Sequence, residues 1–288
     1  MENDKNEKKN VAGLSVIAAV FLTGFKLLVG LMTGSLGILS EALHSGLDLV
    51  AAVITWFAVK VSDKPADINH QYGHGKIENL SALIETILLL VTCAWIVYEA
   101  LSRLLSGNTH IEVTIWSYIV VVSSIVIDFS RSRALSRVAK KHNSQALEAD
   151  ALHFSTDIWS SGVVLLGLIC ANLGYYMADS IAALGVAIIV VYVSIKLGRR
   201  AIDALLDKAP PGMHKHVVLI LSNIPEIRSY HDLRVRTSGA DYFVDVTIHV
   251  DPLLGIRQAH LVSTMVEDII CKNISRCKVQ VHYEPDGE

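Results

Sequence analysis

The chain has 288 residues, of which 52% are apolar and 18% charged, and its formal net charge is −3. Its mean hydropathy of +0.44 is too high for an ordinary soluble domain and indicates a membrane protein. The near-neutral charge gives no sign of nucleic-acid binding, so we expect no nucleic-acid partner. The polar start "MENDKNEKKN" has no small-residue cleavage site, and we therefore expect no signal peptide.

Six apolar segments dominate the first two thirds of the chain. Each is long enough for a helix that crosses the hydrocarbon core of a bilayer, which takes about 20 residues. We predict a cytoplasmic tail over residues 1–10 and a transmembrane domain of six helices over residues 11–205. The six segments are residues 11–33, 36–61, 78–104, 112–134, 147–172 and 177–205.

Lysine and arginine are distributed unevenly between the two ends of these segments. One side carries nearly all of them, whereas the other side carries only Arg103. Because positive charge stays on the cytoplasmic side, this bias predicts a multi-pass protein of the inner or plasma membrane with both termini in the cytoplasm. The cations on the cytoplasmic side are Lys5, Lys8, Lys9, Lys60, Lys64, Lys76, Arg131, Arg133, Arg137, Lys140 and Lys141.

Two similar polar motifs interrupt the second and the fifth segment. The second contains "SEALHSGLD" and the fifth contains "EADALHFSTD", so each has a histidine four residues before an aspartate. Residues four apart lie about 40° apart on a helix, which puts His44 beside Asp48 and His153 beside Asp157. Because the second and fifth segments are expected to run antiparallel, the two pairs can face each other near the middle of the membrane.

Four ionisable side chains are costly to place in lipid. Each costs about 2.5–3.5 kcal/mol at the bilayer centre, so something must compensate them. A divalent cation does so, because two carboxylates neutralise it and two imidazoles complete a tetrahedral shell. The alternative is a hydrogen-bonded network that joins the helices without an ion.

Two further acids share these helix faces. Glu41 and Asp150 each precede a motif aspartate by seven residues and so fall within about 20° of it. We expect them to support the ligands or to gate the path of the ion. For Asp150 the alternative is an acid favoured by the positive end of its helix. Asp128 stands three residues before Arg131, and this spacing predicts a salt bridge at a helix end.

A second group of metal-binding residue types lies between the second and third segments, in "KPADINHQYGHGKIENL". Asp67, His70 and His74 fall within eight residues, and Gly73 and Gly75 loosen the backbone around them. Three ligands with an open position form a plausible zinc site. The alternative is an ordinary polar loop that holds two histidines by chance.

The composition changes after residue 205, where Pro210, Pro211 and Gly212 break the sixth helix. We predict that residues 206–288 form a cytoplasmic metal-binding and dimerisation domain of the α+β class, with a ferredoxin-like α-β-β-α-β order. Both helices are expected on one face of a three-stranded sheet. The predicted elements are helices at 214–224 and 256–273 and strands at 229–239, 241–251 and 278–285.

The other face of this sheet is expected to be polar. Alternation puts His249 opposite the apolar Val244–Val250 series, and it puts His282 and Glu284 on a matching face of the last strand. Together with His231 and His260, these side chains predict a binuclear metal site, which a dimer interface could complete. The alternative is a set of solvent-facing polar residues on an open sheet.

In these features the chain resembles the cation diffusion facilitator family of divalent-metal transporters. The resemblance covers the six spans, the paired His-x3-Asp motifs and the C-terminal domain, and "YGHGK" resembles the loop-borne zinc site of that family. It implies that His44, Asp48, His153 and Asp157 form the transport site. It also implies a homodimer that exports metal from the cytoplasm in exchange for protons.

The ligand types favour Zn²⁺ as the exported ion, with Cd²⁺, Co²⁺ or Fe²⁺ as secondary substrates. Two other functions could use the same intramembrane site, namely a membrane metalloenzyme and a membrane metal sensor. A metalloenzyme needs an open metal position and a base, and the chain has no HExxH motif. We therefore expect a secondary active transporter that works by alternating access and is not an enzyme.

Overall fold

The computed structural model describes residues 2–34, 36–106, 115–172 and 177–287, and it forms two compact units. One unit comprises Met1–Lys64 and Ile77–Ala201, and the other comprises Pro65–Lys76 and Ile202–Glu288. The connection between the second and third helices therefore groups with the C-terminal residues.

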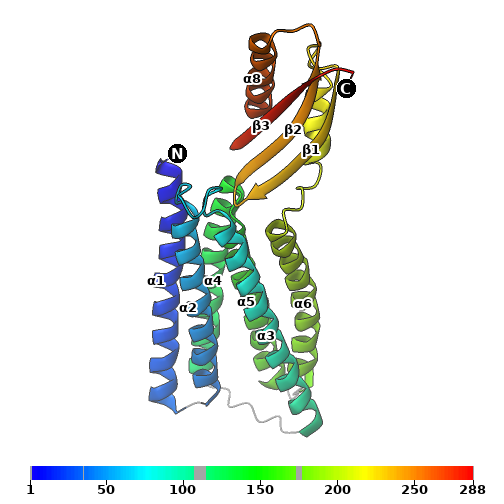
Figure 1. The fold of residues 1–288 in the computed structure, drawn as a ribbon. Helices are drawn as coiled ribbons and strands as arrows, with labels where there is room; N and C mark the ends of the chain where they lie inside the picture. The colour runs from blue at the N-terminus through cyan, green and yellow to red at the C-terminus, as the bar shows by residue number, and fades with distance from the viewer. Residues whose placement is uncertain (1, 35, 107–114, 173–176, 288) are drawn as a thin grey trace. The chain divides into compact units, whose positions relative to one another are not determined.

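The first unit is made of long helices (Figure 1). The shortest of the six has 27 residues, which gives about 40 Å at 1.5 Å per residue and exceeds a hydrocarbon core of about 30 Å. Among the described residues, three segments are both long and apolar enough to cross a membrane: Asn6–Thr33, Glu41–Ser62 and Lys76–Ser102. The helical membrane architecture is confirmed, and the count of six spans stays a prediction. The helices are α1 (Glu2–Thr33), α2 (Leu36–Ser62), α3 (Lys76–Ser106), α4 (Ile115–His142), α5 (Gln145–Asn172) and α6 (Met177–Leu205).

Four of these helices form the packed centre of the unit. Helix α1 packs against α2 and α4, and α5 packs against α4 and α2. Val59, Leu135, Leu147 and Phe154 are fully buried in the apolar cluster between them. Helices α3 and α6 contact each other, and the approach is close because a Cβ on Gly198 would lie 2.9 Å from Thr86. The neighbouring α2 and α5 are the two helices that carry the His-x3-Asp motifs.

Two helices extend well beyond the predicted membrane spans. Helix α1 begins at Glu2 and so takes in most of the expected tail. Helix α4 continues to His142, beyond the predicted span of residues 112–134, and the bounds of that span stay a prediction. Its extension keeps a buried apolar stripe that includes Leu135 and Val138, and its last turn carries cations that favour the negative end of a helix.

The second unit contains a three-stranded sheet in the order β1-β2-β3. Strands β1 and β2 are antiparallel neighbours, and β2 and β3 are parallel. The predicted α-β-β-α-β order is confirmed. The elements are α7 (Met213–Leu221), β1 (Ser229–Ser238), β2 (Asp241–Val250), α8 (Ile256–Asn273) and β3 (Cys277–Pro285).

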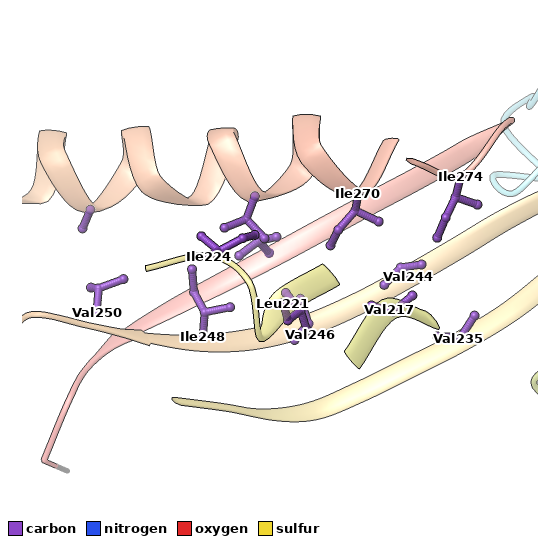
Figure 2. Close-up of a cluster of buried hydrophobic side chains, with 13 residues drawn as sticks. Val217, Leu221, Ile224, Val235, Val244, Val246, Ile248, Val250, Ile270 and Ile274 are labelled. Carbon is purple, nitrogen blue, oxygen red and sulfur yellow. The ribbon is translucent and has the colours of Figure 1, made fainter. Parts of the chain in front are cut away.

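One face of this sheet forms the core of the unit (Figure 2). Val244 and Ile248 of β2 are fully buried, and they share one apolar cluster with Leu221 of α7 and with Val266 and Ile270 of α8. Both helices therefore cover the same face, as predicted. Because side chains alternate along a strand, the intervening β2 residues lie on the opposite face.

Candidate metal-binding sites

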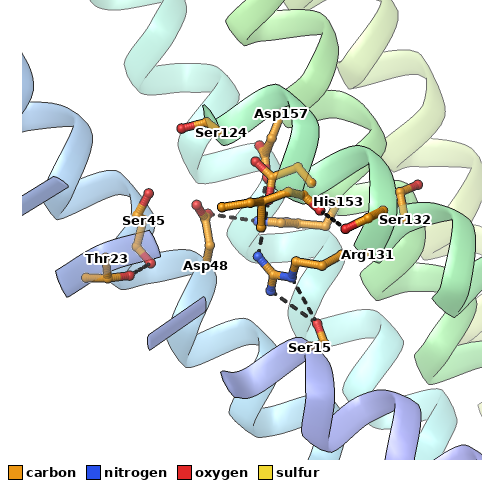
Figure 3. Close-up of polar contacts among 12 residues, drawn as sticks. Ser15, Thr23, Ser45, Asp48, Ser124, Arg131, Ser132, His153 and Asp157 are labelled. Atoms are coloured by element: carbon orange, nitrogen blue, oxygen red, sulfur yellow. Dashed lines mark hydrogen bonds and ion pairs between the residues drawn. The ribbon is translucent and has the colours of Figure 1, made fainter. Parts of the chain in front are cut away.

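Helices α2 and α5 bring the two His-x3-Asp motifs together. The Nε2 atom of His153 lies 3.0 Å from an oxygen of Asp48 and 3.6 Å from an oxygen of Asp157 (Figure 3). The Nε2 atom of His44 lies 4.0 Å from Asp48 and 3.7 Å from Asp157. Each imidazole thus faces both carboxylates, which is the arrangement that the sequence predicts for a shared cation.

Most of this group is buried, and among the described residues no lysine or arginine forms an ion pair with its two carboxylates. Asp48 and His153 are 8% and 3% exposed. Among the described residues, the ion pairs of Asp48 and Asp157 are all with the two histidines. One oxygen of Asp157 is buried without a hydrogen-bond partner. Two carboxylates and two imidazoles in this setting suit a divalent ion of intermediate hardness.

The two additional acids have different surroundings. Glu41 forms an ion pair with Lys26 of α1, at 3.1 Å. Asp150 is 1% exposed, and one of its oxygens accepts a hydrogen bond from the hydroxyl of Ser15, at 3.3 Å. Its other oxygen is buried without a partner. Their expected roles beside the transport site stay predictions.

Arg131 lies within α4 and is 6% exposed, whereas its place on the cytoplasmic side of the membrane stays a prediction. It donates hydrogen bonds to Ser15, lies 3.2 Å from Asp128, and its guanidinium stacks 3.5 Å from the ring centroid of Phe154. The predicted Asp128–Arg131 salt bridge is confirmed, but it is buried in the middle of α4 and not at a helix end. In the sequence, the three-residue spacing of Asp128 and Arg131 within an apolar stretch indicates this buried pair.

A second buried ionic group was not foreseen. The ammonium of Lys8 lies 2.7 Å from Asp63 and 3.1 Å from Glu78, which joins α1 to the end of α2 and the start of α3. Ser62 and Ser144 also donate hydrogen bonds to Glu78. The sequence analysis counted Lys8 only as a cation of the tail, because a sequence does not show which partners approach from other helices.

The loop between α2 and α3 holds the second predicted site. The carboxylate of Asp67 lies 3.1 Å from Nδ1 of His70 and 3.4 Å from Nε2 of His74. The backbone N–H of His70 donates to Asp67 at 2.6 Å and keeps the pKa of this carboxyl below its ordinary value. Asp67 is therefore ionised at neutral pH, and the structure brings all three predicted ligand types together.

This loop rests on the tip of the β1–β2 hairpin. The ring of Tyr72 meets Phe243 edge-on, with 5.5 Å between centroids, and the guanidinium of Arg236 lies over Tyr72 at 4.2 Å. At Gly75, a Cβ would lie 2.3 Å from the carbonyl oxygen of Ser238, so only glycine permits this backbone approach. Gly73 has a φ of 81°, a conformation that favours glycine.

The polar face of the sheet holds the third predicted group. Nδ1 of His231 lies 2.9 Å from Nε2 of His249, and an oxygen of Glu284 lies 3.9 Å from Nε2 of each histidine. His282 lies 3.5 Å from the other Glu284 oxygen. The pairing of His249 with Glu284 across β2 and β3 sets this proximity. A register irregularity between His231 and Arg234 marks a bulge beside His231.

The structure does not bring His260 to this group. It lies on α8, which covers the apolar face of the sheet, whereas His249 lies on the opposite face. Within a single chain the predicted five-residue set is thus split into four residues and one. A role for His260 across a dimer interface stays a prediction.

Comparison with known proteins agrees with these features. Residues 13–206 match the family described as the cation efflux transmembrane domain, and residues 209–286 match the cation efflux protein cytoplasmic domain. The chain belongs to the cation diffusion facilitator family. As a family member it is a cation efflux transporter of the membrane and not an enzyme.

Curated relatives match this chain over nearly its whole length. The cation-efflux pump FieF of Shigella boydii serotype 18 is 30% identical over 280 residues, which cover 94% of this chain and 92% of the relative. FieF of Escherichia coli strain K12 / DH10B gives the same identity and coverage. The solved metal-bound C-terminal domain of the CzcD transporter from Thermotoga maritima is 26% identical, covers 26% of this chain and 90% of that chain, and has a TM-score of 0.26.

Proposed function

We propose that this protein exports Zn²⁺ from the cytoplasm in exchange for protons, by alternating access at the site formed by His44, Asp48, His153 and Asp157. The observation that supports this function best is the convergence of these four side chains from α2 and α5 inside the helix bundle. Ionisable groups without a functional role are rare inside membranes, because each is costly to insert.

The ligand types support zinc as the main substrate. Two imidazole nitrogens and two carboxylate oxygens can surround Zn²⁺, which accepts a tetrahedral shell without a geometric penalty. Mg²⁺ and Mn²⁺ favour all-oxygen octahedral shells and suit this group less well. Cd²⁺, Co²⁺ and Fe²⁺ accept mixed nitrogen and oxygen ligands, and we propose them as secondary substrates.

Proton exchange follows from the protonation state that metal binding requires. A cation needs neutral histidine and ionised aspartate, so its binding releases protons. Free imidazole titrates at about pH 6.5, within the range of cellular pH. A site that holds either metal or protons, and that faces each side of the membrane in turn, can use a proton gradient to move metal outward.

We propose supporting roles for the two groups outside the helix bundle. Asp67, His70 and His74 would bind Zn²⁺ beside the hairpin contact, and we assign this site to regulation. His231, His249, His282 and Glu284 would bind Zn²⁺ on the C-terminal sheet, in a structural or regulatory role. Glu41 and Asp150 would influence the path of the ion next to the transport site.

The arrangement in the membrane belongs to the same proposal. We place six spans within residues 11–205 in the inner or plasma membrane, with both termini and residues 206–288 in the cytoplasm. Residues 206–288 would hold two copies of the chain together as a homodimer. A membrane metal sensor is the remaining alternative, and it would bind metal at the same residues without moving it.

Flux in proteoliposomes tests the proposal. Vesicles that contain wild-type protein should accumulate Zn²⁺ faster than Cd²⁺, Co²⁺ or Fe²⁺ and should respond to an imposed pH gradient. Asp157→Ala should lower the Zn²⁺ flux by about 100-fold or more, because the cation loses a charged ligand. Glu148→Gln changes an exposed acid of the same helix that pairs with Arg200, and it should leave the flux unchanged. Zinc binding without flux would support a sensor, and flux that ignores the pH gradient would contradict proton exchange.

A further inference from the structure

One buried acid has no part in the site described above. Glu85 of α3 is 1% exposed and is among the largest fully buried side chains in the described part of the protein. One of its oxygens accepts hydrogen bonds from the hydroxyls of Thr55 and Ser81, the latter at 3.3 Å. Its other oxygen is buried and has no hydrogen-bond partner.

The surroundings of Glu85 offer no cation to balance a carboxylate. Among the residues that the structure describes, no lysine or arginine lies within ion-pair distance of it, in contrast to the Lys8–Glu78 pair two turns earlier in α3. The charged groups that act on it electrostatically are Asp150 and His153, both from α5. Helix α2 contributes the neutral Thr55. A buried carboxyl without a lysine or arginine partner is less costly as the uncharged acid than as a carboxylate.

Glu85 also lies close to the four-ligand site. Its partner Thr55 follows Asp48 by seven residues on α2, which places the two on the same face, about 20° apart and about 10 Å apart along the axis. Asp150 precedes His153 by one helical turn. Over such a distance, inside a poorly screened helix bundle, a change in the net charge of the site is felt by a neighbouring acid.

We propose that Glu85 is a proton-binding carboxyl of the transport cycle. While the metal-free site carries one proton on its histidines, Asp48 and Asp157 leave it with a net negative charge, which keeps a second proton on Glu85. A divalent cation that displaces the histidine proton cancels this net charge, and Glu85 then releases its proton to the compartment that the site faces and becomes a carboxylate. The inference rests on the proposed metal–proton exchange and adds a proton site that is separate from the metal ligands.

The ratio of protons to zinc provides the main test. In proteoliposomes loaded with a zinc dye and a pH dye, Glu85→Gln should lower the number of protons moved per Zn²⁺ by about one, because the amide keeps the hydrogen bonds but cannot titrate. Glu85→Asp and Ser81→Ala both keep a carboxyl and should keep the wild-type ratio. An unchanged ratio in Glu85→Gln overturns the assignment. No proton movement in the wild type would instead contradict the proposed exchange.

Infrared difference spectroscopy gives a readout that does not depend on transport. Adding Zn²⁺ to the full-length wild type should remove the C=O stretching band of a carboxylic acid. This band should be absent from the Glu85→Gln difference spectrum and shifted in that of Glu85→Asp. The same band loss in all three proteins overturns the proposal, even where one variant is poorly active.

Discussion

At the scale of single residues, Arg131 shows how this bundle tolerates a buried charge. Its guanidinium forms an ion pair with Asp128, donates to Ser15 and stacks on Phe154. Ser15 in turn donates to Asp150, so the cation of α4 is linked to the acid that lies one turn from His153. A hydrogen-bonded and paired charge of this kind can remain in an apolar interior, whereas an unpaired one is strongly unfavourable.

Removal of this cation should therefore destabilise the bundle. We expect Arg131→Met to lower the free energy of unfolding by about 3 kcal/mol, because Asp128 is left buried without its partner. The midpoint of thermal unfolding in detergent should fall by about 5 °C or more. Arg133→Met removes an exposed arginine from the same helix and is the matched control. Equal midpoints for the two variants would contradict a stabilising role for the buried pair.

At the scale of elements, the loop between α2 and α3 and the β1–β2 hairpin form one packed contact. Tyr72 and Phe243 meet edge-on, the guanidinium of Arg236 lies over both rings, and the backbones approach closely at Gly75. Asp207 pairs with Lys76 at 2.9 Å and with Arg236 at 3.6 Å, which adds an ionic link within the same unit. The loop-borne ligands are thus attached to a defined surface.

One methyl group added at Gly75 should separate the loop between α2 and α3 from the β1–β2 hairpin. Gly75→Ala would place Cβ 2.3 Å from the Ser238 carbonyl oxygen, which forces the loop away from the hairpin. We expect amide hydrogen exchange to become at least tenfold faster in the loop and the hairpin tip. Gly24→Ala, where nothing lies within 4 Å of the added atom, should not change exchange there. Unchanged exchange in Gly75→Ala would mean that this contact is absent in solution.

At the scale of the whole molecule, the C-terminal unit has exposed features that favour self-association. Its sheet has only three strands, so both β1 and β3 are edge strands that are open to pairing. Leu253, Ile256 and Leu261 are large apolar side chains that lie exposed near the start of α8. Small units of this kind commonly gain stability by burying such surfaces between copies.

We therefore expect the full-length protein in detergent to have twice the 31.4 kDa mass of one chain in native mass spectrometry. Leu253→Asp combined with Leu261→Asp should weaken the dimer at least tenfold, because charge is placed in an apolar contact. Lys272→Asp changes an exposed charge in the last turn of α8 and should have little effect. A wild-type protein that stays monomeric at micromolar concentration would contradict the dimer.

Much of this architecture could be predicted because local patterns determine it. The period of apolar residues predicted α7, α8 and the strands of the C-terminal sheet, and alternation along β2 predicted its buried face. The paired His-x3-Asp spacing predicted the convergence of His153 with Asp48. The buried positions of Lys8 and Glu85 could not be predicted, because their partners come from other helices. For Arg131 the spacing predicted the pair with Asp128 but not the contact with Ser15 of α1. The position of His260 away from the other four residues within one chain could not be predicted either, because it depends on how α8 packs.

The proposed ligands are divided evenly between two helices, His44 and Asp48 on one and His153 and Asp157 on the other. A translation of one helix along the other by a single turn, about 5.4 Å, would therefore separate the two ligand pairs while each pair stays intact. Each half would keep only one nitrogen and one oxygen donor, too few to retain a dehydrated ion. A translation of this size along the helix axis would thus switch the site between a state that binds the ion and a state that releases it.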